Sequence, residues 1–233
     1  MNNPEYFKDK WTRPKSDFTR YQKTQEAAVQ DFLKVNKVFE FLDGSSFTMR
    51  HYHGLLKSIF HQVYFSSTSF AISGAMSSTS SVAVRRFLLH HAEEEMDHWQ
   101  WILQDLKATG YKGPDPREEH AHWAAQAYLS YGVYLAFFNP TGRLAMAQVL
   151  EGISSAFGSK YGGKALENLK IPREHAKFFL LHGELDQGHA REIGMLLENE
   201  SLSPEGWSDL EHVARTTSIL YKNLYNASME NIV

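Results

Sequence analysis

Long helical patterns separated by short breaks run through the chain, and this regularity constrains the fold more than any other feature. Apolar residues recur at helical spacing, and no segment alternates apolar and polar residues up to an Asn-Gly turn. Gly, Pro and Asp-Gly positions divide the 233 residues into seven predicted helices. Their ranges are 17–42, 46–74, 81–108, 116–138, 141–169, 172–198 and 203 onward. Ser203 is the predicted N-cap of the last helix. Because the connections are short, we predict one all-α domain over residues 1–233.

The composition excludes several classes of protein. There is no cysteine, which rules out disulfides, iron–sulfur clusters and cysteine nucleophiles. The net charge is −3 with the 12 histidines neutral, and no basic stripe is present, so nucleic acid is not an expected partner. The segment MNNPEYFKDKW lacks the apolar core of a signal peptide, and no apolar run is long enough to span a membrane. We therefore expect a cytoplasmic protein with no membrane partner.

The sixth predicted helix carries polar residues on its apolar face. In HGELDQGHAREIG, residues 182–194, His182, Asp186 and His189 stand at i, i+4 and i+7 and share an arc of about 60°. The apolar residues on or beside this arc are Phe178, Leu185, Ile193 and Leu196. We therefore expect the three polar groups to point into a core, where they need compensating partners because their unpaired burial costs several kcal/mol.

The third predicted helix repeats the pattern in LLHHAEEEMDHWQW. His91, Glu95 and His98 again stand at i, i+4 and i+7. Apolar residues extend the same face, namely Val84, Phe87 and Ile102. Glu94 could replace Glu95 because it lies four residues before His98, whereas Glu93 and His90 are expected on other faces. One such triplet can arise by chance, but two favour a functional site.

A further carboxylate comes from the fifth predicted helix. Glu151 is the only acid between residues 143 and 163, and Leu144, Ala147 and Leu150 surround it. A buried carboxylate needs a cation or a proton. The alternative is a partly exposed acid, or one paired with Lys or Arg.

Together, the candidate metal ligands are four imidazoles and three carboxylates: His91, Glu95, His98, Glu151, His182, Asp186 and His189. Nitrogen and oxygen donors without thiolate suit iron or manganese, and zinc also fits these ligand types. Seven donors exceed what one tetrahedral zinc needs, and they match two metals bridged by carboxylates in a helical bundle. Two ferrous ions would bring four positive charges, which three carboxylates nearly balance.

This set resembles that of the haem-oxygenase-like di-iron oxidases and oxygenases, whose fold is shared with thiaminase II and pyrroloquinoline-quinone synthase. The resemblance rests on His182-x3-Asp186-x2-His189, on Glu151 one helix earlier and on Glu95-x2-His98. It implies a seven-helix haem-oxygenase-like bundle with two Fe(II) per chain and O2 as co-substrate. It also implies that Glu95, Glu151 and Asp186 are catalytic carboxylates that keep the cluster charge constant. His98 and His189 would each anchor an iron, and His91 and His182 would complete the set.

The sequence departs from the family pattern at one place. Members often supply a further glutamate from the preceding helix, but residues 46–74 contain no Asp or Glu. His61 lies near the corresponding place, and His91 occupies a position that is acidic in some relatives. The resemblance therefore implies a histidine-rich second metal position that binds weakly or forms only with substrate.

The resemblance implies oxidation of a small amino-acid-derived metabolite by C–C cleavage, desaturation or N-oxygenation, in a biosynthetic setting. We also expect a homodimer. The alternatives are a metal-independent oxidase of the pyrroloquinoline-quinone-synthase type, a fatty-acid-oxidising di-iron enzyme and a non-enzymatic metal binder. Thiaminase II activity is disfavoured because cysteine is absent. Haem oxygenation is disfavoured because the charged ligands would fill the haem pocket, so the glycines Gly158, Gly162 and Gly163 are expected to allow close helix packing or a kink.

The aromatic residues of the fourth predicted helix, Tyr131, Tyr134, Phe137 and Phe138, are expected in the core rather than in a pocket. Arg85, Arg86 and Lys160 could hold a carboxylate, although surface charge is the favoured interpretation.

Overall fold

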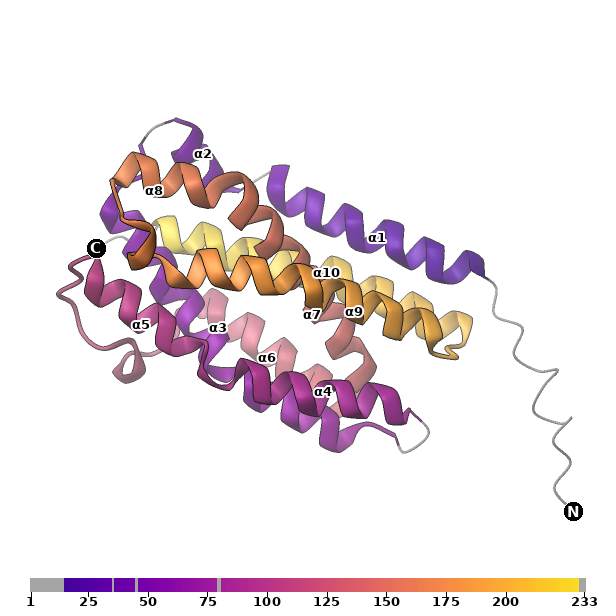
Figure 1. Cartoon of the computed structure of the whole chain (residues 1–233). Coiled ribbons are helices and arrows are strands. Elements are labelled where there is room, and N and C mark those ends of the chain that lie inside the picture. Colours follow the sequence, from indigo (N-terminus) through magenta and orange to yellow (C-terminus); the bar gives the residue numbers. More distant parts are fainter. Residues whose placement is uncertain (1–14, 35, 45, 79–80, 231–233) are drawn as a thin grey trace, which may run out of the picture.

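A computed structural model describes residues 15–34, 36–44, 46–78 and 81–230, without the side chains of Lys15, Ser16, Ser159, Lys160, Glu184, Asp186 and Gln187. These residues form an elongated bundle of helices and contain no strand (Figure 1). The predicted all-α class is therefore confirmed. None of the described helices is both long enough and apolar enough to cross a bilayer.

Ten α-helices are present in the described part of the chain. They are α1 Lys15–Lys34, α2 Lys37–Asp43, α3 Met49–Met76, α4 Val82–Glu94, α5 Trp99–Ala108, α6 Trp123–Phe138, α7 Pro140–Phe157, α8 Gly163–Leu169, α9 Gly183–Asn199 and α10 Pro204–Glu230. Two π-helical turns, Gly158–Gly162 and Phe178–His182, adjoin α7 and α9. Three 3-10 turns occupy Glu95–Asp97, Pro116–Glu118 and Arg173–His175.

The seven predicted helices correspond to these elements, but some are interrupted. The first is divided into α1 and α2 because Asn36 caps α2, accepting a hydrogen bond from the backbone N–H of Val38 at 3.0 Å. The third is divided into α4 and α5 by the turn at Glu95–Asp97. The predicted N-cap of the last helix is confirmed, since Ser203 Oγ accepts from the N–H of Gly206 at 3.2 Å.

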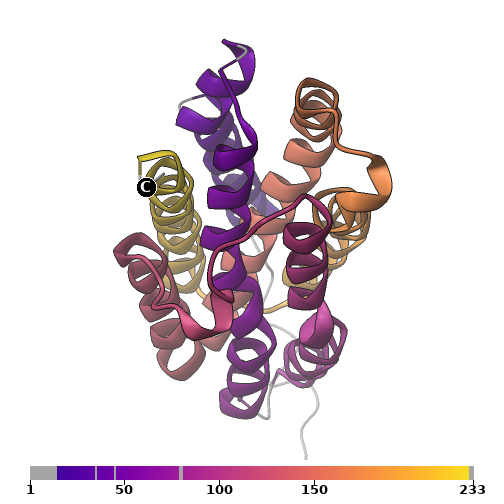
Figure 2. The same ribbon diagram turned by 90° about the vertical axis from the view of Figure 1, so that its left-hand side faces the viewer.

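Helix α3 runs through the middle of the bundle, with the other helices around it (Figure 2). It packs most extensively against α4 and α6, while α7 packs along α9 and α1 packs along α10. The inner faces of these pairs meet in one apolar core that includes Phe32, Phe60 and Val149. The core therefore holds α4, α7 and α9 in fixed positions, and these helices carry or adjoin the candidate ligands.

Two expectations about buried residues are wrong. Tyr134, Phe137 and Phe138 of α6 are 55%, 44% and 76% exposed, and only Tyr131 of the four aromatic residues is partly buried. Helix α6 is apolar on nearly all sides, so its sequence does not indicate which side faces the core. Leu185 of α9 is likewise 44% exposed and lies outside the core.

Candidate metal centre

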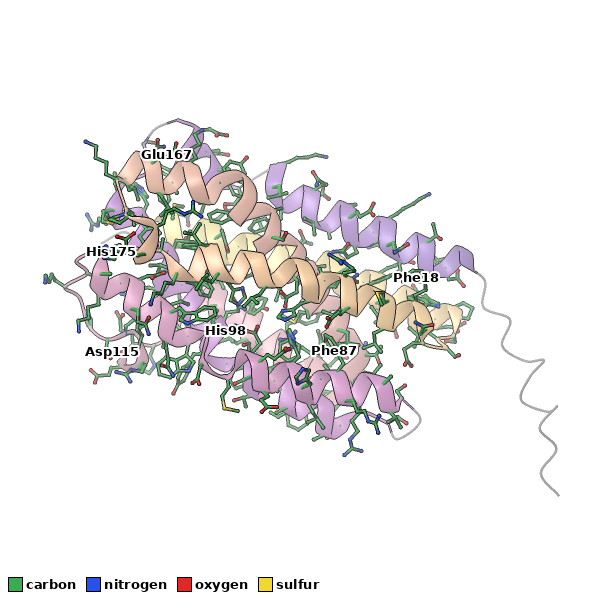
Figure 3. All side chains as sticks on the ribbon, in the orientation of Figure 1. Phe18, Phe87, His98, Asp115, Glu167 and His175 are labelled. Carbon is green, nitrogen blue, oxygen red and sulfur yellow. The ribbon has the colours of Figure 1, made fainter. Side chains whose placement is uncertain are left out.

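Six of the seven candidate ligands converge in two groups between α4, α7 and α9. His91, Glu95, Glu151 and His189 form the first group, and Glu95 with His98 and His182 forms the second. Within each group, one potential ligand atom from each residue lies within 4.8 Å of the others. Figure 3 places His98 in the interior where α4 meets α5. The side chain of the seventh candidate, Asp186, lies outside the described residues.

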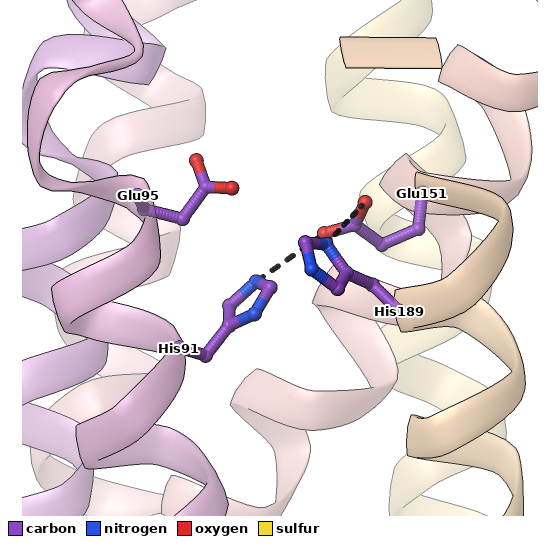
Figure 4. A group of neighbouring side chains, drawn as sticks. All are labelled: His91, Glu95, Glu151 and His189. Atoms are coloured by element: carbon purple, nitrogen blue, oxygen red, sulfur yellow. Dashed lines mark ion pairs between the residues drawn. The ribbon is translucent and has the colours of Figure 1, made fainter. Parts of the chain in front are cut away.

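The first group consists of side chains from opposite sides of the bundle. His91 and Glu95 face Glu151 and His189 across the interior (Figure 4). His91 Nε2 lies 3.4 Å from Glu151 Oε1, and His189 Nδ1 lies 3.7 Å from Glu151 Oε2. The imidazole rings of His91 and His189 meet edge to face at 4.6 Å. The four side chains therefore surround one small volume.

Glu95 belongs to both groups and begins a change in the backbone. The helix tightens into a 3-10 turn at Glu95–Asp97 before α5 begins, so the triplet is not on one continuous helix as the sequence pattern predicted. In the second group, Glu95 Oε1 lies 3.2 Å from His98 Nδ1, and Glu95 Oε2 lies 3.8 Å from His182 Nε2. The hydroxyl of Ser66 on α3 lies 3.2 Å from Oε2 and shares its one proton between this carboxylate and the backbone oxygen of Val63, which is 3.0 Å away.

His182 is the last residue of a π-helical turn, a feature that is frequent at functional sites. This turn packs against the end of α7 at Gly158. A Cβ atom at Gly158 would lie 3.2 Å from the backbone oxygen of Phe179, so a larger residue would push the two segments apart. The predicted role of Gly158 in close packing is therefore confirmed, and Gly162 ends the π turn that follows α7.

Several polar atoms of the centre are buried without a hydrogen-bond partner among the described residues. They are both ring nitrogens of His91, Glu95 Oε1, His98 Nδ1 and Glu151 Oε2. Burial lowers the pKa of His91 to about 4 and keeps its imidazole neutral near pH 7. Burial alone would raise the pKa of Glu95, but the imidazoles of His182 and His98 outweigh it and hold that pKa well below its usual range. Neutral imidazoles and ionised carboxylates are the forms that bind metal ions.

Aromatic side chains enclose the imidazoles. Phe70 meets the ring of His91 edge to face at 4.4 Å, and Phe87 stacks on it at 5.4 Å. Trp101 stacks on His98 at 4.3 Å. These contacts restrict the rotation of the rings and limit the access of water.

The residues flanking His91 and Glu95 lie where the pattern placed them. His90 and Glu93 are exposed, as predicted. Glu94 remains at the edge of the first group, because its Oε2 lies 3.6 Å from His91 Nδ1 while its side chain is 41% exposed. His61, by contrast, lies outside both groups and lines a separate cavity with Glu119 and His122. Helix α3 supplies Ser66 to the centre instead.

A cavity next to the two groups contains an arginine that sequence reasoning missed. Arg143 of α7 lines it together with Ala147 and Glu151, which stand four and eight residues later on the same helix face. Arg143 is only 3% exposed. Among the sequence-based candidates for holding a carboxylate, Arg85 and Arg86 do not line this cavity, and the side chain of Lys160 lies outside the described residues.

Residues 58–219 match the family model described as iron-containing redox enzyme. The chain belongs to this family. A comparison with curated proteins finds no match in sequence. The matched region contains every residue of both groups, so the family assignment and the geometry concern the same part of the molecule.

Solved structures establish the fold. A domain of unknown function with a heme oxygenase-like fold from Shewanella denitrificans OS217 is 19% identical, covers 91% of each chain and has a TM-score of 0.81. A TenA homologue from P. horikoshii OT3 is 13% identical over 92% of this chain and 98% of that chain, with a TM-score of 0.70. A TenA homologue from Pseudomonas syringae is 12% identical over 91% and 92%, with a TM-score of 0.72. The predicted haem-oxygenase-like fold is therefore confirmed.

The residues of the centre fit the iron that the family description implies. Iron binds imidazole nitrogen and carboxylate oxygen, and these are the donors present. The partnerless atoms of His91, Glu95, His98 and Glu151 would gain a partner in a bound cation. The donors thus satisfy both the chemistry of the ion and the requirement that buried polar groups be paired.

Proposed function

We propose that this iron-containing redox enzyme is a non-haem di-iron oxygenase or oxidase. It would use O2 to oxidise a small amino-acid-derived metabolite by C–C cleavage, desaturation or N-oxygenation. The observation that carries the proposal is the position of Glu95, whose carboxylate belongs to both groups of donors. A carboxylate shared in this way would contribute donor oxygens to both ions of a two-metal site in a helical bundle.

The two groups suggest how the ligands divide between two Fe(II) ions. His91, Glu95, Glu151 and His189 would hold one iron, and Glu95, His98 and His182 would hold the other. Asp186 would be the seventh ligand, since it stands between His182 and His189 on the same helix. When bound, the iron pair would supply the electrons that activate O2.

The protein's own side chains prepare the site for this role. The hydroxyl of Ser66 shares its proton with Glu95 and restrains the rotation of the carboxylate. Because the pKa of His91 is about 4, its imidazole needs no deprotonation before it binds a metal near pH 7. Phe70, Phe87 and Trp101 keep the surroundings apolar, which limits competing reactions with water.

The partners and location expected from the sequence are also part of the proposal. The enzyme would act on a small-molecule substrate as a cytoplasmic homodimer, with no nucleic-acid or membrane partner.

Anaerobic titration of the metal-stripped protein with Fe(II) tests the proposal, followed by Mössbauer spectroscopy before and after O2. We expect about two irons per chain and a coupled diferric product. O2 consumption is then screened with amino acids and fatty acids. His90→Ala serves as a control for the loss of a histidine, because His90 adjoins His91 but is exposed. This variant should bind as much iron as the unaltered protein. Failure to bind iron would refute the proposal, and metal-independent O2 consumption would support a pyrroloquinoline-quinone-synthase type of oxidase.

A further inference from the structure

Arg143 is a buried cation whose hydrogen-bonding capacity is only partly used. Its Nε donates to Ser69 Oγ at 3.0 Å, and its guanidinium carbon lies 3.7 Å from the centre of the Phe70 ring. Its Nη1 is buried and has no hydrogen-bond partner among the described residues. Arginine stays charged in proteins, so the burial of this group requires a compensating anion.

The carboxylates of the metal centre do not serve as that anion once iron is bound. Glu95 and Glu151 are near enough to influence Arg143 electrostatically. Under the proposed function, however, both carboxylates are iron ligands. The two ferrous ions carry four positive charges, and three ligand carboxylates leave one positive charge uncompensated. Arg143 adds another, so the loaded site has an excess of positive charge.

The cavity joins Arg143 to the metal centre. Glu95, Glu151 and His182 line it on one side, and much of the remaining wall is apolar, including Phe178. Its volume is about 30 Å³, which accommodates about two water-sized groups. The two oxygens of a carboxylate match this space. A larger substrate body needs the apolar wall to move.

We propose that Arg143 is a specificity-determining residue that binds the carboxylate of the substrate. This inference rests on the proposed di-iron function and specifies that its amino-acid-derived substrate keeps a free carboxylate and has an apolar body. Guanidinium and carboxylate pair through charge-assisted hydrogen bonds, which Nη1 has available. Because the cavity is small, the atoms bonded next to the carboxylate would lie nearest the iron ligands. This placement suits oxidation at the carbon bonded to the acid group or at a nitrogen attached to that carbon.

Calorimetric binding of hexanoate and hexanamide to the anaerobic Fe(II)-loaded protein tests the inference. The two probes have nearly the same shape and differ in charge. We expect hexanoate to bind at least about 30-fold more tightly than hexanamide, and Arg143→Gln to abolish this preference. Arg143→Lys keeps the charge and should retain part of it. Arg86→Gln is the matched control, because Arg86 is an exposed arginine that does not line the cavity.

The outcomes separate the two proposals. Two irons per chain with no preference for hexanoate would overturn the role of Arg143 alone. A preference that survives in Arg143→Gln would also overturn it, because the carboxylate would then be bound by iron. Absence of iron binding would refute the di-iron function, whatever the probes show. If Arg143→Gln does not fold, Ser69→Ala replaces it, since this change removes only the hydrogen bond that orients Nε and should weaken the preference.

Discussion

Two regions of the molecule place several histidines beside glutamate: the candidate metal centre between α4, α7 and α9, and a cavity beside α3. The second cavity has a volume of about 190 Å³ and is lined by His61, His120 and His122 with Glu119. Both regions have histidine and glutamate, residues that can bind metal ions. In the described residues, only those of the metal centre bring their ligand atoms within 4.8 Å of one another.

The pairing of the acids accounts for the difference. Glu119 already forms an ion pair with Lys57 at 2.8 Å, so its charge is compensated without a metal. The ion-pair partners of Glu95 and Glu151 among the described residues are histidines instead, and an imidazole is neutral unless it is protonated. The comparison teaches that histidine content is a weaker sign of a metal site than buried acids that face imidazoles.

The largest effect is expected for Glu95→Ala. Because Glu95 belongs to both groups, its removal should lower the affinity of both irons by more than about 100-fold and abolish O2 consumption. Ferrous titration measures the change. Glu94→Ala is the control at the neighbouring, half-exposed position and should keep two irons. Equal losses in the two variants would contradict the assignment of Glu95 as the bridging ligand.

A smaller effect is expected when a ligand of one group alone is removed. His189→Ala should weaken the iron of the first group, and His98→Ala should weaken that of the second. Each variant should therefore bind about one iron per chain. Mössbauer spectra should then show an uncoupled ferric ion after O2. Loss of both irons in each variant would mean that the two positions fill only together.

Ser66→Ala should have a still smaller effect. It removes the hydrogen bond to Glu95 but no candidate ligand, so we expect iron affinity to fall about tenfold. Ser73→Ala is a matched control, because Ser73 is buried on the same helix and donates only to the backbone of Ser69. An unchanged affinity in Ser66→Ala would show that the carboxylate is held by its other contacts.

Much of this architecture could be predicted because the signals are local. The spacing of His182 and His189 places both on one helix face, whatever that helix packs against. Glu151 was identifiable as a lone acid in an apolar segment. The break at Glu95–Asp97 could not be foreseen, because the helical pattern continues through it.

Arg143 and the aromatic residues of α6 show the limits of such reasoning. A single arginine in a helix normally indicates solvated surface, so Arg143 was missed, and only its position four and eight residues before Ala147 and Glu151 could have indicated a shared face. Phe138 is apolar yet 76% exposed, since the packing of α6 rather than its composition decides which side is buried. Both cases depend on contacts between distant segments.

His61→Ala is the prediction with the smallest expected effect, and it tests the comparison from its other side. The sequence placed His61 near a ligand position, but the rotation of α3 about its axis turns Ser66 rather than His61 towards the centre. We therefore expect the variant to bind two irons with unchanged affinity and to consume O2 normally. Ferrous titration at equal protein concentration provides the measurement. A loss of one iron would mean that α3 supplies a ligand after all, and that the two histidine-rich regions act as one site.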